Sequence, residues 1–473
     1  MTPVVSPLGL SPDRLFPADP DTRSVARRIH ETVRDLPITS PHGHVNARVL
    51  LDDQPFPDPA TLFVTPDHYV TRLLHSAGIG LDVLGVGRES LSETEAREVW
   101  RLLCSHWHLY RGAPVRFWLE SELANIFDVR LKLSADTADT IYDQVAERLV
   151  TDGYRPRALY ARFRIAVLAT THDPIDDLSA HAALAADPTW GGRVIPTFRP
   201  DRYLEPATSG WCAAIADLAK AADVDTGDHA GFVAALEARR RYFIAHGAVS
   251  ADHSHLDVRT DPLDPTEAER IHRAALTGNV TAGEATAYRR HMLLEMARMS
   301  CEDGLVMTLH PAVRRGHSGP TTQRFGSDTG NDIPVRAEFT DALHPLLERY
   351  GLHPGFHLVV FTLDETVWSR ELAPLAGFYP SVYVGVPWWF LDAPHAIRRF
   401  QAAVTETAGF YRLSGFVDDT RAFCSIPARH DMSRRLDAGW LAQLVAEQQL
   451  DENEAMDIAR HLVDDQPREV FKL

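Results

Sequence analysis

A His-x-His pair is the sharpest local feature of the sequence, because His42-Gly43-His44 directly follows the apolar run 37–41. Residues i and i+2 of an extended strand point to the same side, so both imidazoles can face one space. Two imidazoles at a strand end can share a divalent metal ion. The alternative is a structural, hydrogen-bonded role for one or both histidines.

Asp418-Asp419-Thr420-Arg421 follows another apolar run near the end of the chain. A carboxylate there could complete a metal site or act as a general base. Arg421 could bind a substrate carboxylate through two parallel hydrogen bonds. The alternative is that an aspartate only caps the following helix.

Other apolar runs are each followed by one or two residues that could bind a substrate. His310 could contact a substrate, and Arg199 could bind an anionic group. Trp388 and Trp389 could wall a sugar site, since aromatic faces cover C–H surfaces well. A structural histidine, a surface ion pair and core packing are the respective alternatives.

Eight short apolar runs lead into such polar residues, which predicts eight strands that are covered on both sides. They span residues 37–41, 165–169, 194–198, 248–251, 305–309, 358–362, 382–385 and 413–417. Helical patterns lie between them, so the predicted class is parallel α/β. Polar residues gathered at the carboxyl ends of eight strands favour a (β/α)₈ barrel of the TIM type, with a doubly wound sheet as the second choice.

The spacing of the runs predicts the domain organisation. Residues 1–45 hold an N-terminal helix and the first strand, and residues 46–160 form a helical insertion over the barrel mouth. Residues 161–473 form the rest of the barrel, with a smaller helical insertion at about 200–246. Thr281 and Glu284 have the spacing of a capping box that opens a helix through Met299.

Composition narrows the classes of protein. The 473 residues carry 48 Lys+Arg and 65 Asp+Glu, a net charge of −17, which argues against binding nucleic acid. Four widely spaced cysteines without a C-x-x-C argue against disulfides and thiolate zinc sites. Residues 1–20 do not resemble a signal peptide, and no apolar stretch is long enough to span a membrane. We therefore expect a cytoplasmic protein that binds neither nucleic acid nor membrane, with a homo-oligomer left open.

Several motifs, in this order along the chain, together resemble the uronate (glucuronate) isomerases of the amidohydrolase superfamily. They are Ser40-Pro41-His42-Gly43-His44, Asp67-His68-Tyr69, Thr170-Thr171-His172-Asp173-Pro174-Ile175-Asp176, Phe198-Arg199-Pro200-Asp201, Ala251-Asp252-His253, Leu309-His310, Trp388-Trp389-Phe390, Asp419-Thr420-Arg421 and Arg429-His430. The resemblance runs nearly end to end.

This resemblance implies a distorted (β/α)₈ barrel with a helical insertion after the first strand. It implies the interconversion of D-glucuronate with D-fructuronate, and of D-galacturonate with D-tagaturonate, by proton transfer through a cis-enediol. It also implies one divalent metal per site, with zinc favoured and His42, His44 and Asp419 as its ligands. Whether activity strictly requires the metal stays open.

The resemblance also assigns roles in catalysis and in hexuronate binding. Asp419, alone or with Tyr69, is the candidate for proton transfer, and His68 and His310 are expected to contact hydroxyls. The expected substrate-binding residues are Arg199, Arg421, His310, Arg314, Trp388 and Trp389. Departures from the family pattern bear on substrate preference: Arg315-Gly316-His317-Ser318 replaces an Asn run, Glu120 stands where a His is frequent, and His172 replaces an acidic residue.

Two other functions stay open at this point. One is a mononuclear zinc hydrolase on the same barrel that acts on a sugar-acid lactone or amide. A lysine-bridged binuclear site is disfavoured, because no lysine lies between Lys220 and Lys472. The other is a sugar-acid binding protein without activity, which the convergent His, Asp and Arg residues disfavour.

Overall fold

The core of the fold is a curled sheet of seven parallel strands, seen in a computed structural model that describes residues 7–473. The strands are β1 (Ile38–Ser40), β2 (Ile165–His172), β3 (Val194–Phe198), β4 (Ser250–His253), β5 (Val306–Leu309), β8 (Leu358–Val360) and β9 (Val382–Val384), hydrogen-bonded in that order. Each coincides with a predicted apolar run, and every pairing is parallel. The predicted α/β barrel is therefore confirmed in a distorted form.

The eighth predicted strand, 413–417, does not form a ladder. Leu413 makes a single parallel bridge with Val384. Two residues later, Gly415 has a φ of +75°, which a regular strand does not use. The segment still closes the barrel at its carboxyl end, because His44 N donates a hydrogen bond to Thr420 O at 3.0 Å. Seven strands and one irregular segment thus replace the eight predicted strands.

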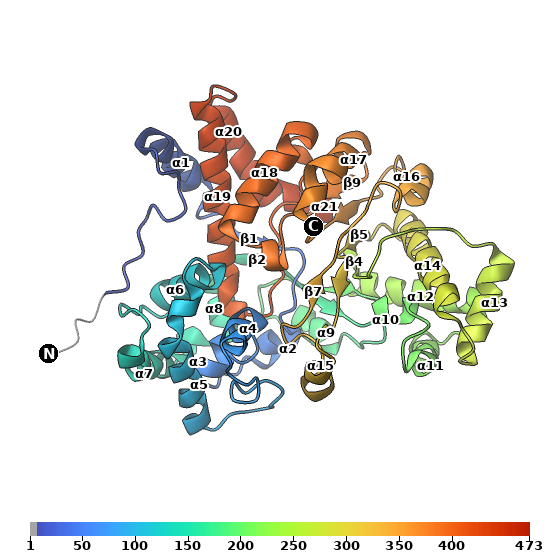
Figure 1. Ribbon diagram of the computed structural model, residues 1–473, viewed down its shortest axis with the longest axis horizontal. Helices are drawn as coiled ribbons and strands as arrows, with labels where there is room; N and C mark the ends of the chain where they lie inside the picture. Colours follow the sequence, from blue (N-terminus) through green and yellow to red (C-terminus); the bar gives the residue numbers. More distant parts are fainter. Residues whose placement is uncertain (1–6) are drawn as a thin grey trace.

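Between β1 and β2 the chain forms a helical region with its own apolar core. Its helices are α2 (Ala47–Asp52), α3 (Pro59–Phe63), α4 (His68–Ser76), α5 (Glu93–Ser105), α6 (Pro114–Asn125), α7 (Ala138–Leu149) and α8 (Pro156–Arg162). They gather on one side of the sheet (Figure 1, blue to cyan). Asp67 caps α4, since its side chain accepts a hydrogen bond from Tyr69 N at 2.8 Å. That cap fixes the direction in which α4 begins, at the cavity described below.

The remaining helices cover the sheet and connect its strands. They are α1 (Pro20–Val33), α9 (Ser179–Ala186), α10 (Asp201–Leu204), α11 (Trp211–Ala222), α12 (His229–Ala245), α13 (Pro265–Leu276), α14 (Ala282–Asp303), α15 (Gly319–Phe325), α16 (His344–Tyr350), α17 (Ala373–Phe378), α18 (Pro394–Ala408), α19 (Ile426–Ala446), α20 (Glu452–Arg460) and α21 (Gln466–Phe471). The predicted capping box of Thr281 and Glu284 is present at the start of α14. Within residues 7–473, no helix is both long and apolar enough to cross a membrane.

The C-terminus packs against the amino-terminal end of the barrel, near the centre of the molecule (Figure 1). Val470 and Phe471 share an apolar cluster with Val306 and Val359 of β5 and β8. Val470 O lies 2.8 Å from His357 Nδ1, just before β8 begins. The last helix therefore closes the barrel at the end opposite the predicted site.

We expect Phe471→Ala to lower the free energy of unfolding by about 3–5 kcal/mol, because Phe471 is fully buried and the barrel cannot refill its volume. Chemical denaturation followed by tryptophan fluorescence measures this change. Phe378→Ala is the matched control, since Phe378 is 71% exposed and its loss should cost about 0.5 kcal/mol or less. Equal effects of the two changes would contradict a packed C-terminal closure.

Candidate active site

A polar cavity of about 290 Å³ lies at the carboxyl ends of the strands. Its lining residues are His42, His44, Asp67, His68, Tyr69, Arg199, Asp252, His310, Arg315, Ser327, Asp328, Trp388, Trp389, Asp419, Thr420 and Arg421. Parallel strands bring their carboxyl ends to one edge of the barrel, so residues far apart in sequence converge there. The volume is at the lower end of the range of small-molecule sites.

The structure brings together every site residue predicted from the sequence except Arg314. The side chain of Arg314 is exposed on the two-residue strand β6 (Val313–Arg314), and its neighbour Arg315 lines the cavity. Arg315 follows directly after β6, where the backbone turns. Of the two adjacent arginines, only Arg315 therefore lines the cavity.

Asp419 lies between the two histidines of the His-x-His pair. Its Oδ1 is 2.9 Å from His44 Nε2 and 3.4 Å from His42 Nε2. Burial would raise the pKa of Asp419, but the two imidazoles hold it well below its usual range. Asp419 also has a φ of +42°, a conformation that non-glycine residues rarely adopt and that is concentrated at functional sites. The site thus holds an ionised carboxylate in a strained loop.

A second carboxylate, Asp252 at the end of β4, supports His310. Its Oδ1 lies 2.6 Å from His310 Nδ1 and accepts a hydrogen bond from the Thr308 hydroxyl at 2.8 Å. Burial would raise the pKa of Asp252, but His310, His42 and Arg199 hold it well below its usual range. An ionised carboxylate only accepts, so His310 carries its proton on Nδ1 and presents a bare Nε2. That Nε2 is buried and has no hydrogen-bond partner within residues 7–473.

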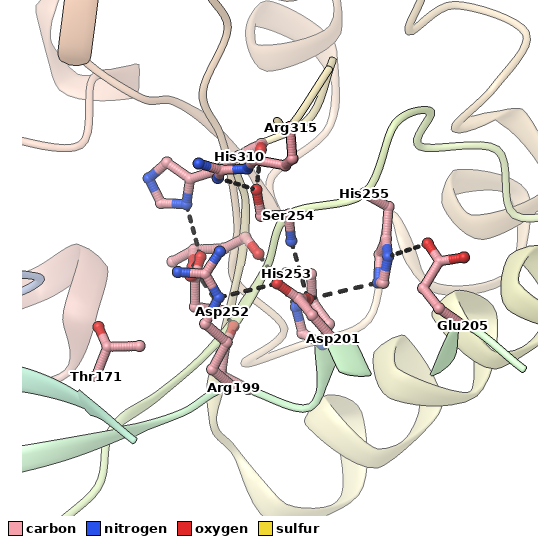
Figure 2. A network of polar contacts seen from close by, with 12 residues as sticks. Thr171, Arg199, Asp201, Glu205, Asp252, His253, Ser254, His255, His310 and Arg315 are labelled. Carbon is pink, nitrogen blue, oxygen red and sulfur yellow. Dashed lines mark hydrogen bonds and ion pairs between the residues drawn. The ribbon is translucent and has the colours of Figure 1, made fainter. Parts of the chain in front are cut away.

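Arg199 is held by carboxylates on two elements (Figure 2). Its Nε donates to Asp201 Oδ2 at 2.9 Å, and its Nη1 lies 3.5 Å from Asp252 Oδ2. Asp201 in turn accepts a hydrogen bond from Ser254 N at 3.0 Å. The Ser254 hydroxyl donates to His310 O at 2.8 Å and accepts from Arg315 Nη2 at 3.0 Å. One network therefore fixes Arg199, His310 and Arg315 relative to one another.

Helix α4 contributes His68 and Tyr69 from the helical region. Their rings stack with centroids 4.8 Å apart. Burial, aided by Arg421, lowers the pKa of His68 to about 3, so its imidazole is neutral at pH 7. Burial raises the pKa of Tyr69 far above its usual value, so its phenol keeps its proton. Arg429, buried on α19, lies 4.9 Å from the Tyr69 ring centroid and helps to hold it.

His42, His310 and Asp419 could hold a metal ion, because their ligand atoms lie within 4.8 Å of one another. One buried atom of this set, His310 Nε2, has no hydrogen-bond partner among the described residues. Two imidazole nitrogens and a carboxylate oxygen suit zinc and related ions. The donors present therefore fit a divalent metal. His44, expected as a ligand from the sequence, lies outside this group and contacts Asp419 instead.

Six cavity residues were not predicted as site residues: Asp67, Asp252, Arg315, Ser327, Asp328 and Thr420. Asp252 could have been predicted as a site residue, since it directly follows a predicted strand as other site residues do. Asp328 could not have been predicted in this way, because it lies in a loop between β6 and the strand β7 (Ile333–Pro334).

A family model for glucuronate isomerase matches residues 21–471 of this chain. The chain belongs to the glucuronate isomerase family. A curated uronate isomerase of Cutibacterium acnes is 52% identical over 466 residues, covering 98% of this chain and 99% of the relative.

Solved structures agree with this family. The glucuronate isomerase of Caulobacter crescentus superimposes with a TM-score of 0.96 at 44% identity, covering 98% of this chain and 97% of that one. The uronate isomerase of Thermotoga maritima gives a TM-score of 0.91 at 27% identity, with 98% and 99% covered. Membership in the glucuronate isomerase family confirms the resemblance inferred from the motifs, and it makes the chain an enzyme of the aldose–ketose isomerase class.

Proposed function

We propose that this enzyme interconverts D-glucuronate with D-fructuronate and D-galacturonate with D-tagaturonate through a cis-enediol. The observation that carries the proposal is one cavity that holds the ionised Asp419, several imidazoles, among them the neutral His68, and arginines. A hexuronate needs a cation for its carboxylate, a base for its C2 proton, and donors for the charge that develops on O1 and O2. The cavity supplies all three.

The arginines are proposed to bind the C6 carboxylate of the sugar. Arg199 and Arg421 both line the cavity. Asp201 and Asp252 hold Arg199 in place, so its remaining N–H groups can face the substrate. Trp388 and Trp389 both line the cavity and would cover the C–H faces of the sugar. Binding through the carboxylate would fix C2 against the base.

Asp419 is proposed to remove the C2 proton of the open-chain aldose and to return a proton at C1. Its low pKa keeps it unprotonated at neutral pH, as a base must be. Tyr69 keeps its proton, so it would donate a hydrogen bond to the enediol oxygen rather than act as a second base. Neutral His68 would hydrogen-bond an adjacent hydroxyl, whereas the bare Nε2 of His310 would bind the metal ion.

The proposed metal is zinc, held by His42, His310 and Asp419. When bound, such an ion would polarise a carbonyl oxygen of the sugar. We expect added zinc to raise the melting temperature of the metal-free protein, by the equivalent of about 2.7 kcal/mol at a hundred times the dissociation constant. Differential scanning fluorimetry measures this shift. No shift in the wild-type protein, or an equal shift in His42→Ala, would contradict the assigned ligands.

A cytoplasmic location is part of the proposal. All four cysteines are free thiols in the structure, as expected of a protein from a reducing compartment. Cell fractionation tests it, and recovery from outside the cytoplasm would contradict it.

Conversion assays with the purified, zinc-supplied protein test the function. We expect ketose from D-glucuronate, D-galacturonate or both, and no hydrolysis of D-glucuronolactone beyond the spontaneous rate. Lactone hydrolysis without any ketose would favour the hydrolase alternative and contradict the isomerase proposal.

A further inference from the structure

Residues 315–332 form an excursion from the barrel that reaches the rim of the cavity. The antiparallel pair β6 and β7 closes its base. The Asp332 side chain ties the two sides together, because it accepts hydrogen bonds from Gly316 N at 2.7 Å and from Arg315 Nη1 at 3.0 Å. The excursion is therefore anchored where it leaves the barrel.

The far part of the excursion rests on helix α4. Gly330 has a φ of +84°, and a Cβ at this position would lie 3.1 Å from Arg72 Cβ and 3.5 Å from His68 Cβ. This close approach leaves little room for a side chain at position 330. The contact holds the preceding residues, Ser327 and Asp328, at the cavity, which both of them line.

Asp328 places a carboxylate of the protein beside two cavity arginines. Its Oδ2 lies 3.4 Å from Arg421 Nη2, and its Oδ1 lies 3.9 Å from Arg315 Nη1. The side chain is 46% exposed, whereas that of Asp252 is 1% exposed. Asp328 can therefore turn into water at little cost, while the deeper carboxylate cannot.

We propose that Asp328 is a specificity-determining residue that occupies the carboxylate-binding position of Arg421 until the substrate carboxylate replaces it. This inference rests on the proposed function, which assigns Arg421 to the C6 carboxylate. A carboxylate ligand must compete with Asp328 for Arg421, whereas a neutral polyol has no group that takes its place. Asp328 thus lowers the affinity of the site for carboxylates and leaves its affinity for neutral polyols unchanged.

Binding of two unreactive probes to the full-length, zinc-supplied enzyme tests this inference by isothermal titration calorimetry. D-glucarate carries carboxylates at both ends of the hexose skeleton, and D-glucitol carries none. We expect Asp328→Asn to lower the dissociation constant of D-glucarate about threefold to tenfold and to change that of D-glucitol less than about twofold. Asp328→Ser should behave in the same way, so the result does not depend on how one variant folds.

Asp332→Asn is the contrasting variant. It removes the carboxylate that holds Arg315, so it should weaken D-glucarate binding. Weaker binding of both probes to Asp328→Asn would mean that Asp328 holds sugar hydroxyls. Unchanged D-glucarate binding, or none to any variant, would likewise overturn the inference. Because neither probe turns over, these results are separate from failure of the proposed isomerisation, which the conversion assays detect.

Discussion

Asp419→Asn should lower kcat about 10³-fold with little change in KM, because a positioned general base contributes about 10²-fold to 10⁴-fold. Asparagine keeps the size of the side chain and can still accept a hydrogen bond from His44 or His42, but it cannot take up a proton at neutral pH. Steady-state assays with D-glucuronate and D-galacturonate measure the change. Bound zinc should be measured on the same samples, since Asp419 belongs to the candidate metal group.

Asp418→Asn is the matched control for this prediction. Asp418 is also buried, but its Oδ2 contacts His430 Nε2 at 3.1 Å, on the side of α19 and away from the cavity lining. Asparagine can keep that contact, so we expect less than about a tenfold loss. If Asp418→Asn lost more activity than Asp419→Asn, the assignment of Asp419 as the base would be wrong.

Arg199→Ala is expected to lower kcat/KM about 10²-fold to 10³-fold, chiefly through KM. The change removes a charge-assisted contact to the substrate carboxylate and leaves Asp252 with one cation fewer in a buried position. The free energy of unfolding should fall by about 3–5 kcal/mol for the second reason. Kinetics with both uronates and chemical denaturation measure the two effects.

Two controls separate these effects from general damage. Arg202→Ala, in α10, removes a half-exposed arginine that pairs with Asp173 outside the cavity, so activity should change less than about twofold. Millimolar guanidinium should restore part of the activity of Arg199→Ala by filling the vacated position. Full activity of Arg199→Ala would mean that Arg199 does not bind the substrate.

The barrel was predictable because its strands are nearly continuous apolar runs, and the site because reactive residues end those runs. His42, Arg199, His310 and Asp419 each follow a run, and parallel pairing brings them to one edge. Asp252 also follows an apolar run. Its role depends on its contact with His310, however, and the spacing of residues in the sequence does not predict that contact.

Some features of the structure could not be predicted, because they depend on backbone details that residue type does not determine. The run 413–417 is as apolar as the others, yet the positive φ of Gly415 interrupts pairing. Arg314 and Arg315 are adjacent arginines, and only the backbone turn after β6 decides which one faces the cavity. Asp328 reaches the cavity because its loop packs on a helix more than 200 residues earlier, a contact with no local signal.

An NMR time course in D₂O tests the central claim, proton transfer at C2, most directly. Purified, zinc-supplied enzyme is incubated with D-glucuronate, and in parallel with D-galacturonate. The account predicts a ketose together with deuterium at C2 of the remaining aldose, and the loss of both signals in Asp419→Asn. Ketose formed by Asp419→Asn at the wild-type rate would contradict Asp419 as the base. No ketose and no exchange with either sugar would contradict the isomerase itself.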